Sequence, residues 1–186
     1  MVAITAVMLG SSPACASPPD AGAPRAVRVV AVGDLHGDLD NAVATLRLAG
    51  LVDEQGHWIG GEAILVQTGD TTDRGPESRS VLDLLMRLEG EAEKAGGRVV
   101  ALLGNHEAMN MLGDWRYVHP GDVQQFGGAE ARARAFSAQG AYGAWLRGLP
   151  AVAVVEETVF VHGGVSPTWA AQGVDGMNQQ VHTALS

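Results

Sequence analysis

The sequence predicts a layered α/β sandwich, and three observations support this fold class. Three apolar runs of strand length follow one another along the chain, and segments with helical periodicity separate them. Two further apolar runs, at residues 151–155 and 158–161, lie close enough together for a β-hairpin. The chain has 186 residues and 46% hydrophobic content, which is enough for one domain with a sizeable core.

The first predicted unit is a strand followed by a helix. Residues Val27–Val32 form a continuous apolar run, which is typical of a buried strand. Leu39, Val43 and Leu46 then recur at helical spacing, and Gly50 favours the end of this helix.

The second unit repeats this pattern and leads into a third strand. Ala63–Gln67 is predicted as a buried strand, and Pro76 suits the first turn of the helix after it. That helix ends near Gly96–Gly97, and Val99–Leu103 is the third predicted strand. The apolar stripe of the helix consists of Val81, Leu84, Leu85 and Leu88.

A helix and a hairpin complete the predicted elements. Residues Ala129–Leu146 have a helical pattern that Gly140 and Gly143 interrupt. Ala151–Val155 and Thr158–Val161 form the predicted β-hairpin. Trp145 and Leu149 are expected in the core.

The charge balance excludes some classes of partner. Lys and Arg number 12 against 21 Asp and Glu, so the net charge is -9, and the mean hydropathy is +0.08. Broad attraction to nucleic acid or to anionic lipid is therefore not expected. An anionic substrate must be held by something local, such as a bound metal ion or one well-placed arginine.

The beginning of the chain resembles a secretory signal. Val2–Leu9 is an apolar run too short to cross a bilayer, and Ala14–Ala16 fits a cleavage site after Ala16. We expect residues 1–16 to be a signal peptide, 17–26 a linker and 27–186 the domain, in the periplasm or secreted. Lipid modification of Cys15 is the alternative, which residues 12–14 fit poorly. Cleavage would leave no cysteine for a disulfide or a thiol nucleophile.

Polar clusters follow each predicted strand or hairpin. They are GDLHG at residues 33–37, GDTTDRG at 69–75, GNHE at 104–107 and VHGG at 161–164. Loops beyond the carboxyl ends of strands meet at one rim in layered α/β folds. The clusters offer carboxylate, amide and imidazole groups but no thiolate, which suits divalent Zn, Mn or Fe. Two such ions can clamp a phosphoryl group and activate water for its hydrolysis.

In this order the four motifs resemble the calcineurin-like metallophosphoesterases. GDTTDRG with GNHE is similar to the phosphoprotein phosphatase branch, and Trp58–Gly61 and Asn110–Val118 resemble the Shewanella-like protein phosphatases. The resemblance extends from Val27 to at least Pro167. It implies an α/β/β/α metallophosphoesterase sandwich, incomplete at its C-terminus, that binds two divalent metal ions.

The resemblance also implies the metal ligands. Asp34 and His36 would bind the first ion, Asp70 would bridge the two ions, and Asn105 and His162 would bind the second. The family's further histidine, from a later GH motif, has no counterpart before Ser186, and the surroundings of His182 do not match that motif. We therefore expect a fragment or truncated gene, a tighter first metal site and weak phosphatase activity.

The same resemblance implies the residues that handle the phosphate. Arg74, with Asn105, would bind the phosphate group, because a guanidinium is always charged and matches phosphate oxygens. His106, oriented by Asp73, would protonate the leaving oxygen. His106 and Glu107 do not begin a zinc-protease HExxH motif, because Asn110 stands where its second histidine would be.

Other polar residues carry weaker expectations. A single GDLHG would suit a structural turn as well as a metal site, and only the set of four motifs favours metal binding. His57, His119 and His182 are expected to be ordinary surface or loop residues. Residues 115–117 (Trp115, Arg116 and Tyr117) would either line a substrate groove or pack a loop.

Three functions follow from this reading. The first is hydrolysis of phosphate monoesters on proteins, with phosphoserine, phosphothreonine and phosphotyrosine left open as substrates. The second is hydrolysis of diadenosine tetraphosphate by the same metal motifs. The third is binding of metal or phosphoprotein without turnover, which the missing late ligand motivates.

Overall fold

Three parallel strands form the central sheet, in the order β1–β2–β3. They are β1 (Val29–Val32), β2 (Ile64–Gln67) and β3 (Arg98–Ala101). The structure, a computed structural model, describes residues 27–185, and the predicted signal and linker segments lie outside these residues. All four residues of β2 are buried, because this strand has a neighbour on each side and a layer on each face.

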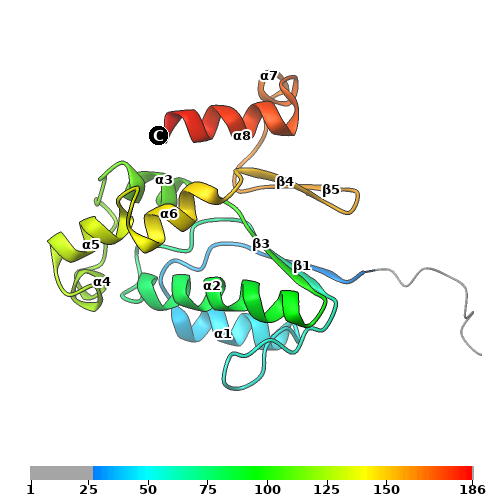
Figure 1. Cartoon of the computed structure of the whole chain (residues 1–186), viewed down its shortest axis with the longest axis horizontal. Helices are drawn as coiled ribbons and strands as arrows, with labels where there is room; N and C mark the ends of the chain where they lie inside the picture. The colour runs from blue at the N-terminus through cyan, green and yellow to red at the C-terminus, as the bar shows by residue number, and fades with distance from the viewer. Residues whose placement is uncertain (1–26, 186) are drawn as a thin grey trace, which may run out of the picture.

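Helices α1 (Leu39–Leu48) and α2 (Ser78–Lys94) cover one face of this sheet (Figure 1). Their apolar stripes meet the inner side chains of the strands, and Leu46, Leu85 and Leu65 are at most 1% exposed in this cluster. Asp38 caps the start of α1: its carboxylate accepts a hydrogen bond from the Asn41 backbone N–H, and this bond lowers the pKa of Asp38.

A two-stranded antiparallel sheet packs on the other face. Strands β4 (Val152–Val155) and β5 (Thr158–Val161) form the hairpin, and Val155 contacts the β2 residues Ile64 and Val66 in a small core between the two sheets. Helix α8 (Gly173–Ala184) packs against β4, and the short α7 (Pro167–Ala170) precedes it. Figure 1 shows the resulting order of helices, parallel sheet, hairpin and α8, which confirms the predicted α/β/β/α layers.

Four short helices connect β3 to the hairpin. They are α3 (Asn105–Met111), α4 (Pro120–Gln125), α5 (Ala129–Phe136) and α6 (Ala141–Gly148). Their inner faces form a second core around the rings of Phe126, Phe136 and Tyr142, with ring centroids 5.5–6.1 Å apart. Trp145 and Leu149 also pack in the core, as expected.

The structure corrects some predicted boundaries. The single helix expected over residues 129–146 is two helices, because the chain turns at Ser137–Gly140. A Cβ atom on Gly143 would lie 2.0 Å from the Ser137 carbonyl oxygen, so the two helices meet more closely than a side chain allows. Helices α3, α4, α7 and α8 were not predicted, and β1 begins at Val29 rather than Val27. Within residues 27–185, every helix is too short or too polar to cross a bilayer.

Candidate metal centre

The four motif loops meet at the carboxyl end of the parallel sheet. Residues 33–37 follow β1, residues 69–75 follow β2, residues 104–107 lead from β3 into α3, and residues 161–164 end the hairpin. The carboxyl ends of parallel strands lie on one edge, and the hairpin brings its own loop to the same place. The structure thus joins side chains that lie far apart in the sequence.

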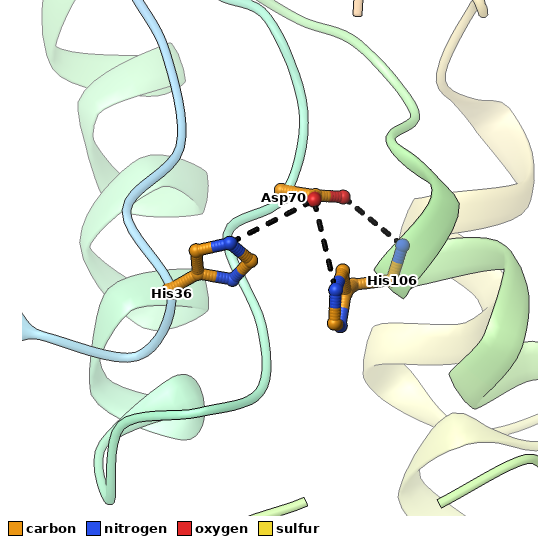
Figure 2. A group of neighbouring side chains, drawn as sticks. All are labelled: His36, Asp70 and His106. Atoms are coloured by element: carbon orange, nitrogen blue, oxygen red, sulfur yellow. Dashed lines mark hydrogen bonds and ion pairs between the residues drawn. The ribbon is translucent and has the colours of Figure 1, made fainter. Parts of the chain in front are cut away.

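His36 faces two carboxylates. Its Nε2 atom lies 3.4 Å from Oδ2 of Asp34. The same atom lies 3.8 Å from Oδ2 of Asp70, the contact drawn in Figure 2. Its Nδ1 atom lies 3.0 Å from the Thr72 carbonyl oxygen, a contact that orients the ring and leaves Nε2 free. Nε2 is buried without a hydrogen-bond partner among the described residues, which fits a position for a metal ion.

His162 faces the same aspartate from the other sheet. Its Nε2 atom lies 3.3 Å from Oδ2 of Asp70 and 3.1 Å from Oδ1 of Asn105. Its Nδ1 atom lies 3.1 Å from the Thr68 carbonyl oxygen, which directs Nε2 toward the two oxygen donors. Asp34 completes this side, with Oδ1 at 3.9 Å from Nδ1 of His162.

Asp70 belongs to both groups of donors. One group joins His36, Asp70 and His106, the other joins Asp34, Asp70 and His162, and the ligand atoms within each group lie within 4.8 Å of one another. Asp70 is 3% exposed, so its carboxylate cannot be satisfied by water alone. Oxygen and imidazole donors arranged around a shared carboxylate fit divalent cations.

The loops hold four site residues in the left-handed backbone region. The φ angles are 44° at His36, 56° at Asp70, 70° at Asp73 and 63° at Arg74, and only Glu156 joins them among non-glycine residues of the described chain. Such a conformation costs about 1–3 kcal/mol per residue. It persists only where surrounding contacts hold the backbone in place, and such residues cluster at functional sites. The strain therefore marks the same residues that the motifs mark.

Backbone hydrogen bonds between the first two loops maintain this conformation. The N–H groups of Leu35 and His36 both donate to the Asp70 carbonyl at 2.9 Å, and Gly75 donates to the His36 carbonyl at 2.9 Å. A Cβ atom on Gly75 would lie 2.4 Å from the Gly37 carbonyl oxygen, so the loops approach too closely for any side chain there. The glycines of the motifs let the donor loops touch.

Glu107 anchors the second and third motifs from beneath. Its carboxylate is fully buried and accepts hydrogen bonds from the backbone N–H groups of Asp70, Thr71, Thr72 and Gly104 and from the hydroxyls of both threonines, at 2.8–3.2 Å. Charged acceptors form the stronger class of hydrogen bond. Glu107 therefore fixes the backbone on either side of Asp70 without being a candidate ligand.

His106 and Asp73 form a buried pair at the floor of the site. Nδ1 of His106 lies 2.8 Å from Oδ2 of Asp73, and the Asn110 amide donates to Oδ1 of Asp73 at 2.9 Å. The His106 backbone N–H donates to Asp70, and its Nε2 atom lies 3.8 Å from Oδ2 of Asp70 (Figure 2). With Nδ1 held by Asp73, only Nε2 faces the other site residues.

Arg74 lies beside the donors on an open surface. It lines a hollow of about 360 Å³ with Asp34, His36 and other residues of the first loop and α1. Its backbone N–H donates to the Tyr117 carbonyl at 2.9 Å, and the half-exposed Tyr117 ring lies 5.1 Å from the His106 ring. The guanidinium is exposed and so is available to an anion at the site.

The structure separates the three neighbours at residues 115–117. Trp115 packs over the buried guanidinium of Arg132 at 5.3 Å, whereas Tyr117 faces His106 and so lines the site. Arg116 is exposed and forms an ion pair with Asp114 at 2.6 Å. The packing interpretation is thus right for Trp115, and the groove interpretation suits Tyr117.

The remaining histidines lie outside both donor groups. His57 contacts Glu91, and His119 accepts a hydrogen bond from the Gly121 N–H at the start of α4. His182 lies in α8, with Nε2 at 2.9 Å from the Leu149 carbonyl oxygen.

We compared the sequence with profiles of known protein families, and one family matches. The profile described as calcineurin-like phosphoesterase matches residues 27–184. The chain belongs to this family. The match covers all the strands and donor residues described above, so the calcineurin-like phosphoesterase fold and the observed layers agree.

Individual family members resemble the chain in different degrees. Shewanella-like protein phosphatase 1 of Plasmodium berghei is 34% identical over 154 residues, which are 81% of this chain and 42% of that protein. The crystal structure of the cold-active protein-tyrosine phosphatase of a psychrophilic Shewanella species has 31% identity and a TM-score of 0.77, covering 87% of this chain and 50% of that one. A symmetrical bis(5'-nucleosyl)-tetraphosphatase of Janthinobacterium sp. is 30% identical over 128 residues, 67% of this chain and 41% of that protein. The chain thus spans half or less of each of these proteins.

Sequence reasoning missed several residues that organise this calcineurin-like phosphoesterase site. Glu107 and Asn110 follow His106 on the same short helix, and their spacing from Gly104 and His106 is a signal that could have found them. Arg132 of α5 approaches Asp73 and is bonded by Asp122 of α4, and no local pattern indicates these contacts. Such contacts depend on how distant helices pack.

Proposed function

We propose that the chain is the metal-binding portion of a phosphomonoesterase that uses two divalent cations to remove phosphate from proteins. One observation carries this proposal: the buried carboxylate of Asp70 lies 3.8 Å from Nε2 of His36 and 3.3 Å from Nε2 of His162. Asp34 contacts His36 and Asn105 contacts His162, and Arg74 and His106 lie at the same edge. Shared-carboxylate sites with a cationic side chain beside them are suited to clamping a phosphoryl group.

The two proposed cation sites differ in their number of carboxylate ligands. Asp34, His36 and Asp70 would hold the first cation, and Asp70, Asn105 and His162 the second. Divalent cations bound there would supply positive charge for the phosphoryl oxygens and a lowered pKa for an attacking water. Because the first set holds two carboxylates and the second only the shared one, we expect tighter binding at the first set, with Mn, Fe or Zn as the ions.

The chain's own residues would bind the phosphate and move a proton. Arg74 would hold two phosphoryl oxygens with its planar guanidinium. His106 would donate the proton on Nε2 to the leaving oxygen, because its Nδ1 proton is engaged by Asp73. An alkoxide leaves poorly without such a proton, so the proposed reaction needs His106 most for unactivated esters.

Protein phosphomonoesters are the proposed substrates. The Plasmodium relative is called a protein phosphatase and the Shewanella structure a protein-tyrosine phosphatase, and these names support the class. The half-exposed Tyr117 ring next to His106 offers a surface for an aromatic leaving group, which makes phosphotyrosine the first substrate to test.

The experiment assays the whole chain with Mn, Fe or Zn on matched phosphotyrosine, phosphoserine and phosphothreonine peptides. We expect phosphate release that depends on added metal, with calorimetry showing two ions bound at unequal affinities. Asp70→Asn should abolish turnover, while Asp40→Asn, on the exposed side of α1, should leave it unchanged. No release from any peptide would contradict the protein-phosphatase proposal.

Hydrolysis of a dinucleoside tetraphosphate is the second candidate. The Janthinobacterium relative carries that activity in its name, and the same donors and Arg74 would serve it. Release of nucleotide from diadenosine tetraphosphate, with no turnover of phosphopeptides, would establish this function. Tight metal binding without turnover of either substrate would instead favour a binding role.

We also propose that the protein is exported. The short apolar run at residues 2–9 and the small residues before Ser17 support cleavage after Ala16. Expression of the full chain in a bacterium, followed by N-terminal sequencing of periplasmic protein, should give Ser17 as the first residue. Uncleaved protein confined to the cytoplasm would contradict export.

A further inference from the structure

A fully buried arginine lies beneath the His106–Asp73 pair. Arg132, in α5, is 0% exposed; its Nε donates to Oδ2 of Asp122 at 2.9 Å, and its Nη2 lies 3.6 Å from Oδ1 of Asp73. Both carboxylates are also fully buried. The three residues form a chain of charges that runs from α4 and α5 to the floor of the site.

The surroundings of Arg132 are built for a cation. Its guanidinium carbon lies 5.3 Å from the Trp115 ring, 5.5 Å from the Phe126 ring and 4.6 Å from the Phe136 ring. A guanidinium keeps its charge at any physiological pH, and removing a charge from water is costly unless partners surround it. Three ring faces and two carboxylates surround the charge, while Nη1 and Nη2 make no hydrogen bond within the described residues. The compensation of this buried charge is therefore mainly electrostatic.

The contacts of Asp73 assign each of its oxygens. Oδ2 accepts the Nδ1 proton of His106, while Oδ1 accepts from the Asn110 amide and faces Nη2 of Arg132. The Asp73 backbone N–H donates to the Ser78 hydroxyl at 3.0 Å. With both oxygens engaged on opposite sides, the carboxylate cannot rotate without losing one set of contacts.

We propose that Arg132 is a positioning residue that acts through Asp73 on His106. Asp122 fixes the guanidinium by a hydrogen bond, and the guanidinium charge, 3.6 Å from Oδ1, attracts the Asp73 carboxylate. Oδ2 of Asp73 then keeps the His106 ring turned so that Nε2 faces the substrate side. The activity part of this inference depends on the proposed phosphomonoesterase function. The geometric part does not, because the four side chains make their contacts without substrate.

The first test compares esters with poor and good leaving groups. Arg132→Met keeps an unbranched apolar stem at this position but removes the guanidinium and its charge. We expect kcat for phenyl phosphate to fall about 10- to 100-fold, with a much smaller fall for p-nitrophenyl phosphate and an unchanged KM for both. The reason is that a good leaving group needs little protonation, so misplacing His106 affects it less.

The second test uses metal-free protein and needs no activity. In ¹⁵N-labelled protein the Nδ1 proton of His106, in a short bond to a carboxylate, should give a low-field resonance. We expect this resonance to broaden or disappear in Arg132→Met. The matched control is Arg134→Met, because Arg134 lies in the same helix with 74% of its side chain exposed and should change neither test.

The outcomes separate the two proposals. Equal falls in kcat for both esters, or a resonance unchanged by Arg132→Met, would overturn the positioning role. Arg132 would then have only a structural role in packing α5. If the wild-type chain hydrolyses neither ester with metal present, the proposed function fails, and the resonance alone decides about Arg132. If Arg132→Met does not fold, Arg132→Lys is the second variant, because it keeps the charge but loses the planar guanidinium that bonds Asp122 and faces Asp73. It should show the same selective loss, and an unselective loss would overturn the role.

Discussion

Buried carboxylates organise the candidate metal centre, and each has a different task. Asp70 is the donor shared by two groups, and Asp73 orients His106. Glu107 makes no ion pair with any residue of the described part of the chain and instead accepts hydrogen bonds from six donors in two loops. A buried charge is tolerated only where partners replace water, and these three residues show three ways of doing so.

The prediction for Glu107 concerns stability and the metal site together. Glu107→Gln keeps the shape of the side chain but turns an NH₂ group toward backbone N–H donors. We expect the free energy of unfolding to fall by about 3 kcal/mol, because several buried donors lose their acceptor. Metal affinity should fall as well, since the backbone of Asp70 loses its anchor.

Urea unfolding and calorimetric metal titration measure these effects. Glu130→Gln is the control, because the side chain of Glu130 is 93% exposed on α5. A Glu107→Gln protein as stable as the wild type would show that the six hydrogen bonds contribute little.

Two glycines give opposite expectations for the same substitution. A Cβ atom on Gly104 would lie 2.2 Å from Oδ1 of Asp70, whereas one on Gly90, inside α2, would meet nothing within 4 Å. We expect Gly104→Ala to destabilise the fold by about 1–3 kcal/mol through overpacking. Gly90→Ala should stabilise it by about 0.5–1 kcal/mol, because it reduces the freedom of the unfolded chain. Thermal unfolding of both variants measures these changes in stability. A Gly104→Ala protein more stable than the wild type would contradict the close approach between Gly104 and Asp70.

At the scale of elements, the loop before β2 is attached to helix α2 by one acidic side chain. Glu91 accepts hydrogen bonds from the Trp58 N–H and the Arg87 guanidinium and contacts Nδ1 of His57. Burial raises the pKa of Glu91, but these partners outweigh it and hold the pKa at about 2, below the ordinary 4.5. The loop therefore depends on an ionised carboxylate.

This low pKa predicts an acid-sensitive contribution to stability. Because the folded protein binds the Glu91 proton less readily than the unfolded chain, the stabilisation is fully present above pH 4.5 and is lost as the pH falls toward about 2. The difference in unfolding free energy between wild type and Glu91→Gln should shrink over that range. Urea unfolding at several pH values measures it.

Glu93→Gln provides the control for the acid series. Glu93 lies two residues further along α2 and is exposed, so its removal should not change the pH dependence. The difference in unfolding free energy between the wild type and Glu91→Gln would contradict this prediction if it stayed constant down to about pH 2. The charge of Glu91 would then not hold the loop.

At the scale of the whole molecule, the candidate metal centre joins the two sheets. Asp34 and Asp70 follow strands of the parallel sheet, and His162 follows the hairpin. Apart from these donors, a small apolar core around Val155 holds the sheets together. An ion bound between them would therefore stabilise the folded molecule.

Metal binding should accordingly raise the melting temperature. At a free metal concentration about 100-fold above Kd, the stabilisation is about 2.7 kcal/mol, or roughly 5–10 °C for a domain of this size. Scanning calorimetry with and without Mn measures the shift. Asp70→Asn should remove most of it, and an equal shift in this variant would mean that the ion binds elsewhere.

Local patterns were sufficient for much of the fold. The predicted hairpin differs from β4 and β5 by one residue, and the other predicted strands overlap β1, β2 and β3. The reason is that short continuous apolar runs between glycine-rich loops are typical of buried strands. The short helices between residues 105 and 148 were harder. They carry glycines and polar residues, and packing around Phe126 and Phe136, rather than intrinsic propensity, determines where they begin and end.

The sequence by itself determined the order of strands and helices, the family resemblance and the kinds of donor in each motif. Only the tertiary structure decided that Asp70 is common to two donor groups, that His162 meets it from another sheet, and that Arg132 lies beneath Asp73. The physical reason is range: secondary structure follows from periodicity over a few residues, whereas these contacts join residues far apart in the sequence. Asp34 and His162, for example, are 128 positions apart, and they meet only when the sheets and helices pack.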